Sequence, residues 1–354
     1  MKVAYLLTWA GDQRTGVFKK VVDQVSAWGA LGIEAGIFVA TTPASATAWA
    51  GVPHVAHIET YETGRQSFLV QRRLVTMIER WNPAITYVRT TARQVATARA
   101  LHQLPHAIEI QTDDLAESKG LSNLRYGLTL ATRRRCLNGA RGLVFVSREL
   151  AALPSYSRFN SNRTVIGNGI SLERIKPLGP VQVSGQAPRL VFMGLPGIPW
   201  HGLEDILRLA EIRPDWDFDL IGPRAGDLSL PANVSAHGEL DSDNYRAILA
   251  KADAAISTLA LYRNQMAEAS PLKSREYLAL GLPVIGCYED TDIPDGSSIY
   301  LRLANQSGAI IDELPRVEAF VEHWRGLRVP RSDIPYLDTL VKERQRLQFL
   351  RGLL

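Results

Sequence analysis

Short runs of apolar residues alternate with longer amphipathic segments along the first half of the chain. Five short runs have the length and composition of strands buried on both faces: 3–7, 35–40, 85–88, 106–110 and 142–146. The intervening segments predict helices over 17–31, 65–81, 92–103 and 121–138, the first with Val17, Val21, Val25 and Trp28 on one face. Alternating strands and helices predict a parallel sheet that is covered on both sides.

The pattern restarts after a segment without periodicity, 176–188, whose prolines and glycines predict a linker. Beyond it we predict strands at 189–194, 217–222, 233–236, 254–258 and 283–286, and helices at 202–212, 241–251 and 271–280. A separate amphipathic helix is predicted over 334–354, with apolar residues at Leu337, Leu340, Val341, Leu347 and Leu350. The fold class is therefore α/β, with a first Rossmann-like domain in 1–175, a second in 189–330 and a terminal helical segment in 331–354.

Composition agrees with two globular domains. The chain has 354 residues, of which 46% are hydrophobic and 21% charged, and a domain usually takes about 100–200 residues. No segment approaches about 18 uninterrupted apolar residues, and Asp12 and Arg14 end the first apolar run, so we expect neither a membrane span nor a signal peptide. Cys136 and Cys287 have no ligand-like spacing, so neither a disulfide framework nor a zinc site is expected. The expected location is the cytoplasm.

Charge is distributed unevenly along the chain. Residues 1–170 hold 20 Lys and Arg against 11 Asp and Glu, whereas the remaining residues hold 20 against 25. A basic first half suits an anionic membrane or a lipid-linked phosphate, and a merely solubilising surface explains it equally well. The basic residues are scattered over several predicted helices, which argues against nucleic acid. Candidates for a peripheral contact with the inner face of a membrane are Arg72, Arg73, Arg133 and Arg134.

Three glycine-containing turns stand at predicted strand ends: Gly11–Gly16, 167–170 and 194–202. Glycines at a strand-to-helix junction let backbone N–H groups approach an anion at the helix N-terminus. In the third turn, His201 and Gly202 lie directly before the predicted helix. Each turn is also explained by the backbone conformation that a turn requires.

The segment 268–285 is the most informative. Ser270 is predicted as the N-cap of a helix and Pro271 as its first residue, with Gly281 at its end. Lys273 is then in the first turn, where a cation opposes the helix dipole by about 0.3–1 kcal/mol. An anion at this helix end would remove that misfit. Pairing of Lys273 with Glu276, worth about 0.2–0.5 kcal/mol, would do so as well, and these magnitudes do not decide between the two.

The spacing Glu268-ASPLKSR-Glu276, which runs into a helix that ends in Gly-Leu-Pro-Val-Ile, resembles the donor site of the family 4 retaining glycosyltransferases. Further similarity lies at 11–16, 165–177, 192–205 and 237–257, so it covers the second half of the chain well and the first half thinly. The resemblance implies the GT-B fold, in which two Rossmann-like domains face each other across a cleft and the terminal helix crosses back to the first. It also implies retaining transfer from a nucleotide-sugar to a glycan, lipid-linked or small-molecule acceptor, with neither a metal nor a further cofactor.

The resemblance also implies roles for single residues. Glu268 would contact hydroxyls of the donor sugar, Glu276 the ribose, and Lys273 with the Leu272 N–H the diphosphate. In the family a lysine usually precedes the glycine that corresponds to Gly202. Here His201 takes the place of that lysine, and Arg224 would assist it in binding phosphate. The reaction would then depend on Glu268, Lys273 and His201, and the remaining donor-site candidates are Ser270, Gly194, Gly202, Gly238 and Gly16. Acceptor-site candidates are Gln111, at the place of a family histidine, with Arg89 and Arg133.

Other functions fit parts of this pattern. A sugar-nucleotide epimerase or a phosphorylase would share the GT-B fold, and a two-domain solute-binding protein would share the paired α/β architecture. A catalytically inactive scaffold partner would share the fold but does not need the two glutamates and Lys273. The donor sugar, the nucleobase and the acceptor remain unassigned.

Overall fold

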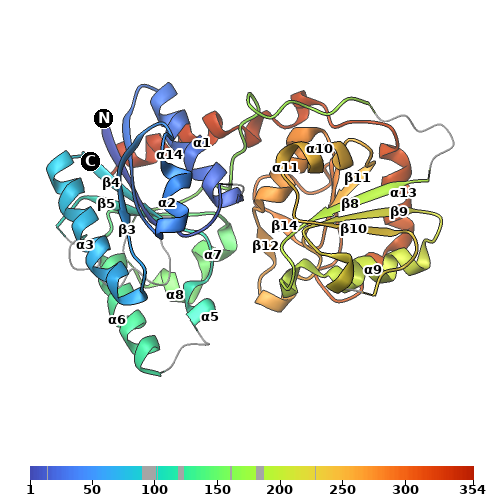
Figure 1. The fold of residues 1–354 in the computed structure, drawn as a ribbon, viewed down its shortest axis with the longest axis horizontal. Helices are drawn as coiled ribbons and strands as arrows, with labels where there is room; N and C mark the ends of the chain where they lie inside the picture. Colours follow the sequence, from blue (N-terminus) through green and yellow to red (C-terminus); the bar gives the residue numbers. More distant parts are fainter. Residues whose placement is uncertain are drawn as a thin grey trace. The chain divides into compact units, whose positions relative to one another are not determined.

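The computed structural model describes residues 1–13, 15–89, 101, 103–118, 123–159, 162–180, 187–227 and 229–354 (Figure 1). The chain divides into two compact units. Unit 1 consists of Met1–Gly169 and Thr339–Leu354, and unit 2 consists of Ile170–Asp338. The helix predicted over 92–103 lies largely outside the described residues.

Unit 1 is built on a seven-stranded parallel sheet in the order β3-β2-β1-β4-β5-β6-β7. Consecutive residues of β1 are buried, because helices cover both faces of a parallel sheet. The strands are β1 (Lys2–Thr8), β2 (Glu34–Thr41), β3 (Val55–Thr60), β4 (Ile85–Arg89), β5 (His106–Ile110), β6 (Gly142–Phe145) and β7 (Asn162–Val165).

The helices of unit 1 are α1 (Gly16–Ala30), α2 (Pro43–Trp49), α3 (Gly64–Trp81), α5 (Asp114–Ser118), α6 (Asn123–Gly139), α7 (Arg148–Ala152), α8 (Pro154–Ser157) and α14 (Thr339–Arg351). Helix α1 begins where the Thr15 hydroxyl accepts the Phe18 N–H at 3.3 Å. Its predicted apolar face is buried around Trp28, and Lys20 and Gln24 are buried on the same helix. The apolar pattern did not predict that these two polar residues would be buried.

Unit 2 is built on a six-stranded parallel sheet in the order β10-β9-β8-β11-β13-β15. The strands are β8 (Arg189–Met193), β9 (Asp217–Ile221), β10 (Val234–Gly238), β11 (Ala254–Ile256), β13 (Val284–Gly286) and β15 (Tyr300–Arg302), with β12 (Glu268–Ala269) and β14 (Glu289–Asp290) paired separately. The helices are α9 (Leu203–Ile212), α10 (Ser242–Leu249), α11 (Leu272–Leu280), α12 (Ala309–Asp312) and α13 (Leu314–Trp324).

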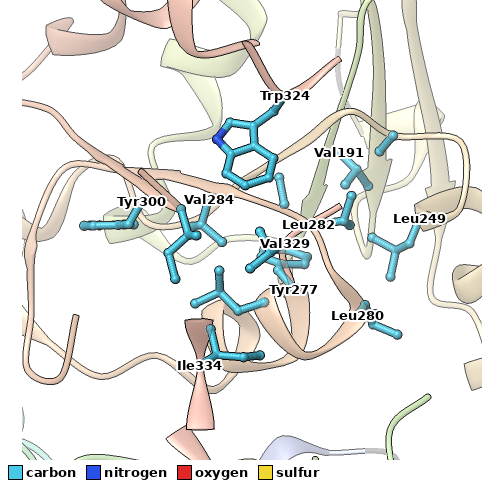
Figure 2. Close-up of a cluster of buried hydrophobic side chains, with 14 of the residues drawn as sticks. Val191, Leu249, Tyr277, Leu280, Leu282, Val284, Tyr300, Trp324, Val329 and Ile334 are labelled. Atoms are coloured by element: carbon cyan, nitrogen blue, oxygen red, sulfur yellow. The ribbon is translucent and has the colours of Figure 1, made fainter. Parts of the chain in front are cut away.

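Helix α11 packs against the unit 2 sheet through a buried apolar cluster (Figure 2). Tyr277 of α11 lies among Val191 and Val284 of the sheet, and its hydroxyl accepts the Met193 N–H at 2.6 Å. The Trp324 indole N–H donates to the Ser298 carbonyl at 2.9 Å, so the largest side chain of this cluster also has its polar atom bonded. This packing fixes α11 relative to the strands beside it.

In each unit the first strand lies inside the sheet, with the second strand on one side and the fourth on the other. The connection that follows β1 therefore runs to one side of the sheet and the connection that follows β4 to the other, and the same holds for β8 and β11. This is the Rossmann strand order, and the crevice at the carboxyl ends of the two central strands is where such sheets bind ligands. The two Rossmann-like parallel sheets predicted from the apolar pattern are confirmed.

The chain ends in α14, which packs beside α1 in unit 1 (Figure 1). Leu347 and Leu350 enter the core that includes Trp28, and the Trp28 indole N–H donates to Glu343 at 2.7 Å. The predicted return of the terminal helix to the first domain is confirmed. The helix begins at Thr339, later than the predicted 334, because residues 331–333 and 335–337 form separate 3-10 turns.

A cluster of buried charges joins α14 to the centre of unit 1. Glu109 of β5 contacts Lys20 at 2.8 Å, Arg89 at 3.2 Å and Arg346 at 3.7 Å. Arg346 also contacts Glu343 and donates to the Tyr87 hydroxyl. Burial by itself would raise the pKa of Glu109, but the three cations lower it to about 2, so the carboxylate is ionised at neutral pH.

Removing the Arg346 charge should therefore destabilise unit 1. Arg346→Met leaves Glu343 buried without its cation, and breaking a buried ion pair from one side costs about 3–5 kcal/mol. Arg344→Met is the matched control, because Arg344 is exposed on the same helix. Amide hydrogen exchange during urea titration should show the loss in unit 1 and little change in unit 2. Equal stability of the two variants would contradict a role for this cluster in holding α14.

Candidate functional site

The candidate site of unit 2 lies where the loops after β8 and β11 meet at the carboxyl edge of the sheet. The Leu259 N–H donates to the His201 carbonyl at 3.2 Å, and the Ala260 N–H donates to the Trp200 carbonyl at 3.1 Å. Gly202 has φ 69°, and a Cβ atom there would lie 2.8 Å from that of Leu259. The close approach of the two loops therefore requires glycine at this position.

Gly194, directly after β8, is also held tightly. Its N–H donates to the Ile221 carbonyl at 3.0 Å, so this amide is used within the fold. A Cβ atom on Gly194 would lie 2.7 Å from the His201 ring, and one on Gly222 would lie 1.9 Å from the Gly194 carbonyl oxygen. Gly194 therefore leaves room for the His201 ring, and its N–H group is not available to a ligand.

Helix α11 starts one residue later than predicted. Its N-cap is Pro271, and no side chain caps it, whereas the sequence predicted Ser270 as the cap. The Ser270 hydroxyl instead accepts a hydrogen bond from Arg275 at 2.9 Å. Since the first N–H groups of a helix have no acceptor within it, the start of α11 at Leu272 presents backbone donors that no side chain caps.

Lys273 lies in this first turn of α11. Its ammonium group is buried, stands 4.4 Å above the Phe192 ring, and has no hydrogen bond or ion pair to any residue that the structure describes. Burial lowers the pKa of Lys273 to about 7. The pairing of Lys273 with Glu276 that the sequence left open is not formed within the described part of the chain. A desolvated cation at a helix N-terminus is a strong attractor for an anion.

His201 also contacts the Phe192 ring, with the two ring centres 5.3 Å apart in a T-shaped arrangement. Burial, and after it the positive charge of Lys273, lower the pKa of His201 to about 3. The imidazole is therefore neutral near pH 7. It can donate or accept a hydrogen bond but adds no positive charge to the site.

Glu268 stands on β12 and is 5% exposed. Its strand pairs with β14, and Arg275 of α11 binds Asp290 of β14 with two contacts of 2.7 Å. Arg275 also reaches Asp292 at 3.1 Å. This buried ion pair joins α11 to the strand pair and so holds Glu268 at a fixed place before the helix.

Glu276 lies half-buried on α11, one turn after Lys273, and its Oε1 accepts a hydrogen bond from the Tyr245 hydroxyl at 2.6 Å. Sequence reasoning assigned no role to Tyr245 or to Phe192. Tyr245 lies within 237–257, a segment that shares in the family resemblance. Its hydrogen bond to Glu276, 31 positions away, cannot be inferred from local periodicity.

The other donor-site candidates are dispersed. Arg224 is exposed beside Gly238, whose φ is 68° and whose added Cβ would lie 3.4 Å from the Arg224 side chain. Leu272 is the first residue of α11. Gly16 belongs to unit 1, where it is the first residue of α1 after the Thr15 cap.

The acceptor-site candidates lie in unit 1, with Arg89 and Gln111 at or after the carboxyl ends of strands and Arg133 on α6. Gln111 follows β5, and its amide nitrogen is buried without a hydrogen-bond partner among the described residues. Arg89 donates to Glu109 within the buried charge cluster. Arg133 is 7% exposed, pairs with Asp114 at 2.7 Å and lies over the Tyr156 ring, so its charge is used inside unit 1. Gln111 Nε2 and Arg133 Nη2 are the buried nitrogen atoms of these candidates without a hydrogen-bond partner among the described residues.

Among the membrane-contact candidates, Arg72, Arg73 and Arg134 are exposed, and Arg133 is not. None of the described helices is both long and apolar enough to cross a membrane. The described residues also contain no group of three or more His, Cys, Asp or Glu side chains arranged to hold a metal ion.

Comparison with known proteins places this geometry in a structural context. No family model matches the chain, and no curated protein does so by sequence. Sucrose-phosphate synthase from Thermosynechococcus elongatus matches 99% of this chain and 98% of its own, at 16% identity with a TM-score of 0.72. WaaB, a lipopolysaccharide outer core galactosyltransferase, matches over 100% of both chains at 13% identity and a TM-score of 0.69.

UDP-GlcNAc 2-epimerase from Neisseria meningitidis, solved with UDP-GlcNAc, matches 99% of this chain and 100% of its own at 13% identity, with a TM-score of 0.58. The two glycosyl-transferring structures are thus closer in backbone than this epimerase. The resemblance to the GT-B glycosyltransferases is confirmed as a likeness of fold: over its full length this chain has the GT-B fold.

Proposed function

We propose that the protein is a retaining glycosyltransferase that moves a sugar from a nucleotide-sugar to a glycan, lipid-linked or small-molecule acceptor. The observation that carries the proposal is Lys273, whose buried ammonium group stands in the first turn of α11 without a hydrogen bond or ion pair among the described residues. A fold gains nothing by keeping a lone cation from water, whereas a bound diphosphate would supply the missing negative charge.

The diphosphate is the leaving group of such a reaction, and its negative charge grows as the glycosidic bond breaks. Lys273 and the uncapped N–H groups that begin with Leu272 would stabilise that charge in place before the reaction. His201, whose pKa is about 3, would act as a neutral hydrogen-bond donor to a phosphate oxygen. Positive charge from the protein therefore comes from Lys273, and the exposed Arg224 would assist.

The two glutamates would divide the donor between them. Glu268, buried on β12, would accept hydrogen bonds from the sugar and place negative charge near a carbon that becomes positive in the transition state. Glu276 would accept hydrogen bonds from the ribose. Gln111 would offer its amide nitrogen to the acceptor. The exposed arginines Arg72, Arg73 and Arg134 would favour an acceptor at an anionic surface.

Binding of a bare nucleoside diphosphate tests the role of Lys273. Since an anion stabilises the charged ammonium, the pKa of Lys273 should rise from about 7 on binding, and affinity should fall up to tenfold per pH unit above pH 7. His201 is neutral over that range and adds no slope. Lys273→Met should weaken binding at pH 6.5 by about 10–100-fold, the value of one lost charge-assisted contact, and should remove the pH dependence.

Calorimetry between pH 6.5 and 9 measures both effects, and Lys251→Met, which removes an exposed lysine of unit 2, is the matched control. The melting temperature of Lys273→Met should stay level or rise, because the variant removes a desolvated charge. A lower melting temperature with unchanged nucleotide affinity would make Lys273 a structural residue and overturn the proposal.

Substitutions of Glu276 and Glu268 should have different effects on nucleotide binding and on turnover. Glu276→Gln should weaken both the nucleotide diphosphate and the donor, because each contains the ribose, by about 10–100-fold for a hydrogen bond to a charged group. Glu268→Gln should leave diphosphate affinity nearly unchanged and lower kcat, as expected for a contact made to the sugar. Diphosphate calorimetry, steady-state kinetics and melting curves on both variants separate the cases. Equal kinetic defects accompanied by large stability losses would count against these roles.

Transfer should not need a divalent metal ion, because Lys273 and the start of α11 supply the positive charge that a cation would otherwise bring. Turnover of a nucleotide-sugar should be the same with EDTA as with added magnesium or manganese, and should require an acceptor. Loss of transfer in EDTA with recovery on adding metal would refute this account of the leaving group. Conversion of the nucleotide-sugar without any acceptor would indicate an epimerase instead.

A further inference from the structure

The hydrogen bond between Tyr245 and Glu276 connects two helices at the candidate site. Tyr245 is on α10 and Glu276 on α11, and their oxygens are 2.6 Å apart. Both side chains are half-buried, so water competes less for this contact than it would at an exposed surface. A short bond from a neutral hydroxyl to a carboxylate belongs to the stronger class of hydrogen bonds in proteins.

The hydroxyl of Tyr245 is held at a fixed place. Its ring packs against the buried apolar cluster of unit 2. Helix α10 begins where Asp241 accepts the Asn244 N–H at 2.9 Å, and Arg246 donates to the Lys176 carbonyl. Burial, and then the negative charge of Glu276, raise the pKa of the Tyr245 phenol, so it remains a donor at neutral pH.

We propose that Tyr245 is a positioning residue that fixes the Glu276 carboxylate for a ribose, so that the site selects ribonucleoside over 2′-deoxyribonucleoside diphosphates. This inference rests on the proposed function. The Tyr245 hydroxyl donates to Oε1 of Glu276 and so fixes the orientation of the carboxylate. Oε2 and the remaining lone pairs of Glu276 can then accept hydrogen bonds from a fixed direction.

A carboxylate offers only acceptors, so its partner must bring O–H or N–H donors. The two hydroxyls of a ribose meet that need from adjacent carbons, whereas a 2′-deoxyribose brings one. Loss of a donor leaves a half-buried charged acceptor without a bond, and a site built to bond a hydroxyl rejects the analogue that lacks it. The discrimination depends on orientation, because a carboxylate free to rotate could turn toward the single remaining hydroxyl.

The test compares matched nucleotide pairs by calorimetry: UDP with dUDP, GDP with dGDP and ADP with dADP. The wild-type protein should bind the ribonucleotide of its preferred pair at least about tenfold more tightly than the deoxy form. In Tyr245→Phe this preference should fall to about threefold or less, mainly because the ribonucleotide binds more weakly. Tyr336→Phe, at another half-buried tyrosine of the same apolar cluster, should keep the wild-type preference.

The possible results distinguish failure of this inference from failure of the proposed function. Equal wild-type affinity for both members of the pair, or an unchanged preference in Tyr245→Phe, overturns the inference while a nucleotide site remains. Equal weakening of both members in Tyr245→Phe, with a lower melting temperature, makes Tyr245 a structural residue and also overturns it. Absence of binding by every nucleoside diphosphate overturns the proposed function itself, together with this inference.

Discussion

The strand order of the unit 2 sheet determines where its chemistry can occur. Because β9 and β11 lie on opposite sides of β8, the connections from β8 and β11 leave the sheet in opposite directions, and sheets with this strand order bind ligands at such a point. The loop after β8 then meets the loop after β11, at an approach close enough to require Gly202. His201 is carried there by the same loop, and Phe192 at the end of β8 lies beneath both His201 and Lys273. Residues from separate parts of the chain thus share one edge of the sheet.

Lys273 and Arg275 stand two residues apart on α11 and differ completely in how their charge is balanced. Arg275 is fully buried and bound by Asp290, Asp292 and Ser270, so its charge serves the fold. The ammonium group of Lys273 is buried beside Phe192, and the described residues provide it with no carboxylate. Burial without a counter-charge lowers stability, and it also strengthens the attraction for an incoming anion, since water no longer screens the charge. This contrast separates the residue that holds the helix from the residue that we propose binds the diphosphate.

Unit 1 contains buried charge of another kind. Glu109 of β5 is contacted by Lys20 of α1, Arg89 of β4 and Arg346 of the terminal helix, so three basic side chains share one buried carboxylate. The cluster lies two residues before Gln111, whose amide nitrogen is buried and unbonded among the described residues. Through Arg346 the terminal helix contacts β5, the strand that ends just before this acceptor-site candidate.

The sequence by itself determined the alternation of strands and helices, the two parallel sheets, the terminal helix and the motif from Glu268 to Glu276, because periodicity, turn residues and spacing are local properties. It did not predict that Ser270 would bind Arg275 instead of capping α11, that His201 would be neutral, or that Lys20, Glu109 and Arg346 would be buried together. Nor did it pair Tyr245 with Glu276. Ionisation and hydrogen bonding depend on which groups exclude water from one another, and these groups are brought together only when distant segments pack.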